Sequence, residues 1–170
     1  MESYPWQSHY PPSVPYTIDP DHYTSVNHFI KTYFERYRDL PMCENMGQRL
    51  TYGDIDRLSK AFAAYLQNYT SLQPGDRLAI QLPNLLQYPI AFLGALRAGM
   101  VVVNLNPLYT HYEMASLLKD SQAKAIVILA NFAHNLEKIL PETAIRTIMV
   151  TEVGDMLGGI QGLATNLAVK

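Results

Sequence analysis

The sequence predicts an α/β domain with a mostly parallel β-sheet that carries helices on both faces. Four short apolar runs alternate with helical segments in the second part of the 170-residue chain. Connections of this length between strands hold crossover helices, and such strands run parallel. The runs are apolar at nearly every position, which is typical of strands buried on both faces. They cover residues 78–82, 100–105, 125–129 and 145–150.

The first twenty residues differ from the rest, because they hold five of the eleven prolines. Proline fixes the backbone in extended conformations and removes a hydrogen-bond donor. We therefore expect an extended arm over residues 1–23 and one α/β subdomain over 24–170, incomplete at its C-terminus. The aromatic side chains of the arm favour contact with the folded body or with a neighbouring copy. They are Tyr4, Trp6, Tyr10 and Tyr16.

Between the arm and the first strand, apolar residues spaced three and four apart predict a helix over 24–38. A short polar hairpin with its turn at 45–47 is expected next. Thr51 and Thr110 each precede an acidic residue by three positions, so each is expected to cap a helix. A further helix ends at Gly99, which can adopt the left-handed conformation of a C-terminal cap. That helix is apolar nearly all round and is expected to be buried, with Pro89 either kinking it or marking its start.

The pattern weakens from residue 154 to the end of the chain. Three glycines between Gly158 and Gly162 favour a flexible turn, and no lysine accompanies them as in a nucleotide cradle. The last apolar run, 163–169, has no polar tail, so the chain looks interrupted.

Composition excludes some classes of protein. The net charge is -2, so there is no basic field to hold a nucleic acid. Charged residues make up 16%, against roughly 25% in a typical soluble domain. Either the interior is unusually apolar, or other protein normally covers part of the surface. We favour cover by other protein, and we expect the isolated chain to self-associate.

The single cysteine, Cys43, and the N-terminal residues indicate a cytoplasmic protein, at most peripheral at the membrane.

No catalytic centre emerges from the residues themselves. The five histidines are scattered, so no metal site is predicted, and no nucleophile elbow occurs. The first two strand-to-helix turns, at 82–84 and 106–109, contain no glycine to cradle a phosphate.

Several stretches together resemble the adenylate-forming enzymes, and in particular the bacterial long-chain fatty-acid CoA ligases. LTYGDIDRL at 50–58 is similar to the first core motif of that superfamily, and GDRLAIQLPN at 75–84 resembles the strand that follows it. LRAGMVVVNLNPLYT at 96–110, with Glu113 after it, is similar to the second core motif. The long-chain branch is indicated by Tyr10-Pro11, Val14-Pro15, PNLLQYP at 83–89 and NFAH at 131–134.

The resemblance implies the N-terminal portion of the large domain of a ligase that uses ATP, magnesium and CoA to make acyl-CoA through an acyl-adenylate. The family's phosphate loop, adenine-binding segment, ribose-binding aspartate and catalytic lysine would all lie beyond residue 170. We therefore expect the isolated chain to be inactive and to bind no cofactor itself. Its expected partners are the remainder of the ligase chain and further copies of itself, and no nucleic acid.

One set of residues is a weaker candidate for ligand contact. Ligands of open parallel sheets gather at the carboxyl ends of the strands. In related acetate-activating enzymes this region resembles part of the CoA nucleotide site, although their glycines and arginines are not matched here. The candidates are Asn106, Asn131, His134 and Lys138. The alternative interpretation is a stand-alone binding or interaction module with a flavodoxin-like sheet and no catalysis.

Overall fold

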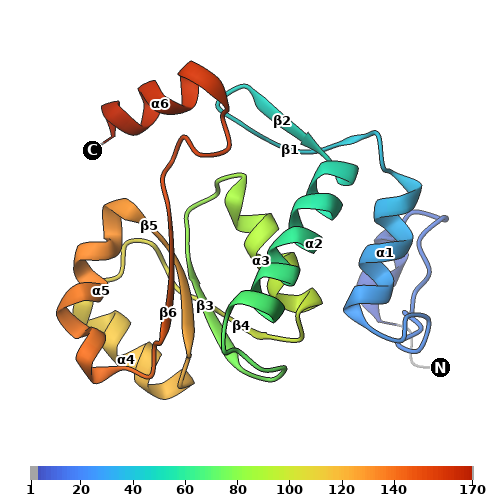
Figure 1. Ribbon diagram of the computed structural model, residues 1–170. Coiled ribbons are helices and arrows are strands. Elements are labelled where there is room, and N and C mark those ends of the chain that lie inside the picture. The colour runs from blue at the N-terminus through green and yellow to red at the C-terminus, as the bar shows by residue number, and fades with distance from the viewer. Residues whose placement is uncertain (1–3, 170) are drawn as a thin grey trace.

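The computed structural model describes residues 4–169 and confirms the predicted α/β fold with a parallel sheet (Figure 1). Within these residues the main sheet has four strands in the order β4-β3-β5-β6, and all neighbouring pairs are parallel. The strands are β3 (Arg77–Gln81), β4 (Val101–Asn104), β5 (Ala125–Leu129) and β6 (Thr147–Thr151). The limits of β5 match its predicted run, and those of the other three strands differ by one or two residues. The chain leaves β3 toward β4 and returns across β3 to β5, so the topological switch point lies between β3 and β5.

Helices cover both faces of the sheet. On one face lie α2 (Tyr52–Tyr69) and α3 (Gln87–Arg97), and on the other α4 (His111–Ser121) and α5 (Ala133–Ile139) (Figure 1). Because side chains alternate along a strand, each inner strand contributes to two cores. Leu78, Ile80 and Val127 face α2 and α3, whereas Ala79, Ile126 and Ile128 face α4 and α5.

The cover is complete over the two inner strands and incomplete over the edges. In β5 every residue is buried, and in β3 all but Arg77 are. The edge strands leave Val101, Ile148 and Val150 exposed. The expectation of near-continuous burial therefore holds for β3 and β5, while β4 and β6 lie at the margins of the helical layers.

A third apolar cluster joins the N-terminal elements to the sheet layers. Helix α1 (Val26–Arg36) buries Ile30 and Phe34 against α2, α3 and a hairpin formed by β1 (Pro41–Asn45) and β2 (Gln48–Thr51). Met46 and Gly47 form the turn with φ values of 49° and 81°. Two positive φ angles in succession characterise the turn type that matches the twist of antiparallel strands. The predicted helix and hairpin are both confirmed.

The predicted helix caps are also confirmed. The Asp54 N–H donates to Thr51 Oγ1 at 3.1 Å, and the Thr51 N–H donates to Asp54 Oδ2 at 3.1 Å. The same reciprocal bonds join Thr110 and Glu113. These backbone donors hold the pKa values of both carboxyl groups below their usual range. Gly99 follows α3 with φ 80°, and Pro89 lies in the first turn of that helix, where it marks the start.

The N-terminal arm is not uniformly extended, since Pro5–His9 form one turn of 3-10 helix, η1. The Tyr4 and Trp6 rings stack on each other at 4.6 Å between centroids. The four aromatic side chains of the arm remain exposed. Contact with the body or a neighbouring copy stays a prediction. Two further 3-10 turns, η2 (Ala130–Phe132) and η3 (Leu140–Glu142), flank α5.

The expectation for the C-terminal segment was wrong. Residues predicted to form a flexible glycine turn begin a helix, α6 (Gly159–Ala168), which lies across the carboxyl end of the sheet (Figure 1). Of the three glycines in this segment, Gly158 and Gly159 have positive φ, at 73° and 47°. Glycine at these two positions turns the chain into the helix, and Gly162 lies inside it.

An ion pair joins the amino ends of the two inner strands. Asp76 immediately precedes β3 and Lys124 immediately precedes β5. Lys124 Nζ donates to Asp76 Oδ1 at 2.6 Å, and the Gln73 N–H donates to Oδ2 at 2.9 Å. The hydrogen bond from Lys124, with that from Gln73, holds the pKa of the Asp76 carboxyl below its usual range.

We expect Asp76→Asn to lower the free energy of unfolding at pH 7 by about 1–2 kcal/mol, because hydrogen bonds to a buried carboxylate are lost. A depressed folded-state pKa stabilises the protein above the unfolded-state pKa of about 3.9, and this contribution is lost as pH falls through the lower folded value. The difference between the wild type and the variant should therefore shrink below about pH 4. Urea unfolding from pH 3 to 7 measures it. Asp120→Asn, at an exposed position on α4, is the control, and an equal loss there would contradict the assignment.

Candidate ligand site at the carboxyl edge of the sheet

The carboxyl ends of the strands meet at one edge, where ligands of open parallel sheets bind. The segments 82–86, 105–110, 130–132 and 152–158 leave the strands at this edge. In open α/β sheets the ligand crevice lies at the topological switch point, which is here between β3 and β5. The Gln81 side chain is fully buried at the end of β3, and its Nε2 donates to the Asn106 carbonyl at 3.1 Å. It thereby ties the loop after β4 across the end of β3.

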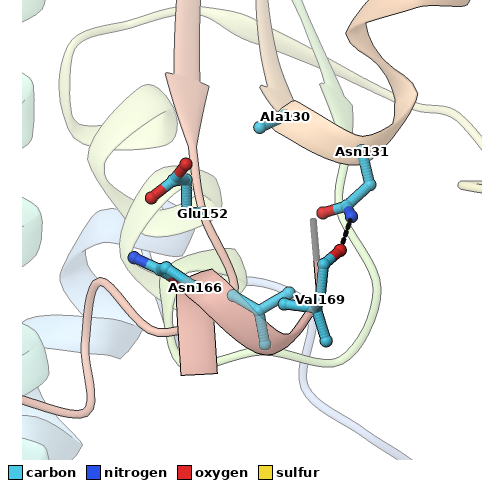
Figure 2. Close-up of a pocket in the computed structure, with 6 residues that line it drawn as sticks. Ala130, Asn131, Glu152, Asn166 and Val169 are labelled. Carbon is cyan, nitrogen blue, oxygen red and sulfur yellow. Dashed lines mark hydrogen bonds between the residues drawn. The ribbon is translucent and has the colours of Figure 1, made fainter. Parts of the chain in front are cut away.

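A hollow with polar side chains around it lies along this edge, one strand further on, beside β5 and β6. Its volume is about 390 Å³. It is lined by Ala130, Asn131, Glu152, Val153, Asn166 and Val169. Figure 2 shows Asn131 and Glu152 coming from the ends of neighbouring strands, with Asn166 and Val169 approaching from α6 and its end. Segments more than thirty residues apart therefore form one site.

A short polar network fixes the wall that α6 contributes. Asn166 Oδ1 accepts from the Gly154 N–H at 2.6 Å, and Asn166 Nδ2 donates to Asp155 Oδ1 at 3.1 Å. The other oxygen of Asp155 accepts from the Glu152 N–H and from the Thr151 hydroxyl, both at 2.8 Å. The carboxylate of Asp155 therefore closes the turn after β6 and orients α6 at the same time.

Two glycines allow α6 to approach that turn. A Cβ on Gly162 would lie 2.5 Å from the Gly154 carbonyl oxygen, and a Cβ on Gly154 would lie 2.3 Å from the Gly162 carbonyl oxygen. Both distances are far below van der Waals contact. Gly162 is thus required by a tertiary contact, although glycine in a helix interior costs about 1 kcal/mol relative to alanine.

Two amides and one carboxylate line the hollow, and both polar atoms of the Asn166 amide are already hydrogen-bonded to the turn after β6. Asn131 Nδ2 donates to the Val169 carbonyl at 2.6 Å, which leaves its carbonyl oxygen facing the hollow as an acceptor (Figure 2). Glu152 adds a negative charge, and the rest of the wall is apolar. Such a site suits neutral groups rich in amide or hydroxyl functions. It disfavours phosphate, because none of the described residues in its wall is cationic.

The structure brings only one of the four predicted ligand residues to this hollow. Asn131 lines it, whereas His134 and Lys138 lie exposed on α5 and are not part of its wall. The exposed Asn106 closes its own turn, since its Oδ1 accepts from the Leu108 N–H at 2.9 Å.

Sequence reasoning missed Glu152 and Asn166. Glu152 directly follows β6, so the rule that placed Asn106 and Asn131 at strand ends also reaches it. Asn166 lies in the apolar run 163–169 and had no such signal, because its position depends on a helix that the sequence did not predict.

The residues present do not fit the phosphates of ATP or a magnesium ion. The turns after β3 and β4 carry no glycine, and the described residues contain no group of three or more metal-ligating side chains. Over the same range, every helix is too short or too polar to span a bilayer.

A family model for the AMP-binding enzymes matches residues 30–165, from α1 into α6. This match covers most of the chain, which therefore belongs to the AMP-binding enzyme family. Within that family it is 50% identical over 165 residues to the long-chain-fatty-acid–CoA ligase of Yersinia pestis and 48% identical to that of Escherichia coli O6:H1. Both alignments cover 97% of this chain and 29% of the relative, so the chain corresponds to the N-terminal part of such enzymes.

Solved structures show the same fold. A long-chain-fatty-acid-CoA ligase from Archaeoglobus fulgidus superposes with a TM-score of 0.66 at 18% identity, over 82% of this chain and 29% of that one. A fatty acyl CoA synthetase from Mycobacterium tuberculosis gives 0.67 at 22% identity, over 81% and 28%. The parallel sheet with its flanking helices is thus the fold of ligase domains of this type.

We expect Gly162→Ala to destabilise the protein by about 2–4 kcal/mol, because its methyl group would collide with the Gly154 carbonyl. Helix propensity alone predicts the opposite sign, a gain of about 1 kcal/mol. Thermal unfolding distinguishes the two. Thr165→Ala in the same helix is the control, and a higher melting temperature for Gly162→Ala would disprove the close approach.

Proposed function

We propose that this chain is the N-terminal part of a long-chain-fatty-acid–CoA ligase, which joins a fatty acid to CoA through an acyl-adenylate formed from ATP. The observation that carries the proposal is the identity of 50% over 97% of the chain to such a ligase. ATP, magnesium and CoA would serve the whole enzyme. The turns after β3 and β4 carry no glycine-rich phosphate cradle, so we assign no catalytic group to the described part of the chain, and the remainder of the ligase is its partner. Self-association of copies stays a prediction.

We expect the isolated chain to show no fatty-acid-dependent exchange of pyrophosphate into ATP, because positioned groups that stabilise the transferring phosphate are needed. A chimera that carries this chain in place of the 165 aligned residues of the Yersinia pestis ligase should catalyse the exchange and form acyl-CoA. Exchange by the isolated chain, or a folded chimera without activity, would contradict the proposal. Circular dichroism establishes that both proteins are folded.

Within this enzyme, the hollow beside β5 and β6 is proposed as a contact for an amide-rich part of CoA. Asn131 is the candidate that the geometry supports, because its amide lies in the wall between two strand ends. None of the described residues in the wall is cationic, so the pantetheine arm, with its amides and hydroxyl, fits better than the nucleotide. Asn106, His134 and Lys138 stay candidates for outer contacts.

In the chimera, Asn131→Ala is expected to raise the KM for CoA roughly fivefold, as the loss of one hydrogen bond of about 1 kcal/mol implies. The KM for fatty acid should be unchanged. Asn68→Ala is a matched control, because Asn68 also donates to a backbone carbonyl but lies at the end of α2. Equal effects on the KM of both substrates, or a fall in melting temperature without a change in KM, would assign Asn131 a structural role only.

A further inference from the structure

Helix α6 turns an apolar stripe outward. Ile160, Leu163 and Leu167 have exposed fractions of 87%, 64% and 66%. Their spacing of three and four places them on one side of the helix. No residue of α6 is charged. A solvent-facing helix ordinarily carries charged side chains on its outer side, so this one has the composition of a covered helix.

The orientation of the stripe is fixed from three directions. Gln161 Nε2 donates to the Met46 carbonyl in the hairpin at 3.0 Å. Asn166 binds the turn after β6, and Asn131 binds the Val169 carbonyl at the end of the helix. These bonds use polar atoms at the start, middle and end of α6. The stripe therefore cannot rotate inward without breaking all three attachments.

A second apolar row lies on the edge strand next to α6. Ile148 and Val150 are exposed on one face of β6. On its other face, an apolar hollow of about 200 Å³ opens between β6 and α3, with Ile90 and Met149 in its wall. The C-terminal third of the chain thus lacks the cover that the helices give to β3 and β5.

We propose that the polypeptide of the ligase beyond this chain packs on the α6 stripe (Ile160, Leu163 and Leu167) and on the exposed edge of β6. This inference rests on the proposed function. It is supported by the length of the relatives, because the chain matches only 29% of each ligase and most of the enzyme lies outside the matched part. Apolar rows of this kind are what such a body would bury.

Two other occupants fit less well. A dimer through α6 would need about 800 Å² of buried surface per partner, whereas ten helical residues are only about 15 Å long and present three apolar side chains. Cover by the same polypeptide avoids the loss of freedom that association of two bodies imposes. A lipid surface attracts helices with Lys or Arg on the polar side, and α6 has neither.

Hydroxyl-radical footprinting tests the proposal on the isolated chain and on the Yersinia pestis chimera described above. The stripe residues should be oxidised in the isolated chain and protected at least tenfold in the chimera. Tyr69, which is exposed at the end of α2, is the internal reference. Pyrophosphate exchange by the same chimera reports on the proposed function separately. An active chimera with an oxidised stripe overturns this inference alone, and an inactive one with a protected stripe overturns only the function.

Two further outcomes of the footprinting would contradict the proposal. Protection in the chimera that appears only as its concentration rises assigns the stripe to a second copy. Protection only with phosphatidylglycerol vesicles assigns it to a membrane, and either result overturns the proposal. If the chimera does not fold, footprinting of the Yersinia pestis ligase tests the same proposal. The residues of its aligned helix that correspond to the stripe should then be protected.

A double variant, Leu163→Glu with Leu167→Glu, supplies a second measurement. It should shift the melting temperature of the isolated chain by no more than about 2 °C, as exposed substitutions do. In the chimera it should lower the melting temperature by about 4 °C or more, because two charges would be buried. Tyr69→Glu is the control in both proteins. Equal shifts in the isolated chain and the chimera would overturn the proposal.

Discussion

Burial of β3 and β5 on both faces is the constraint on which the rest of the structure depends. A strand covered on both sides has no polar face, so its backbone groups must pair with neighbouring strands and its connections must cross over as helices. The pairing β4-β3-β5-β6 and the two helical layers follow from this requirement. The same requirement directs all four carboxyl ends to one edge and so creates the place where a site can form.

The sequence predicted those elements whose pattern is local. The apolar strands, the capping threonines and the hairpin turn at 45–47 each depend on neighbouring residues, and all are present. Helix α6 was missed for a physical reason. Its Gly162 lowers helix propensity but is required by the close approach of the Gly154 carbonyl, a tertiary contact that no local pattern reveals.

The residues of the candidate site also fall into those that a local pattern predicts and those that depend on tertiary contacts. Asn131 follows a strand, so the position of strand ends predicted it, while Asn166 reaches the hollow only because α6 folds across the edge. His134 and Lys138 were placed near the site by sequence proximity. They lie on α5, which leads away from the edge as it packs on the sheet, and both side chains point to solvent.

The sheet order alone does not separate a ligase part from a flavodoxin-like module, because both place a switch point between the first and third strands of the series. What separates them is the surface that the fold leaves open. A complete doubly wound domain covers its last strand, as this chain covers β5, whereas β6 and α6 keep apolar side chains in solvent. The low charged fraction of the sequence is thus explained in part by residues such as Leu163 and Val150, which have no cover within residues 4–169. An apolar composition that a domain cannot bury by itself is a property of a part, and the 29% share of each relative that the chain spans agrees with it.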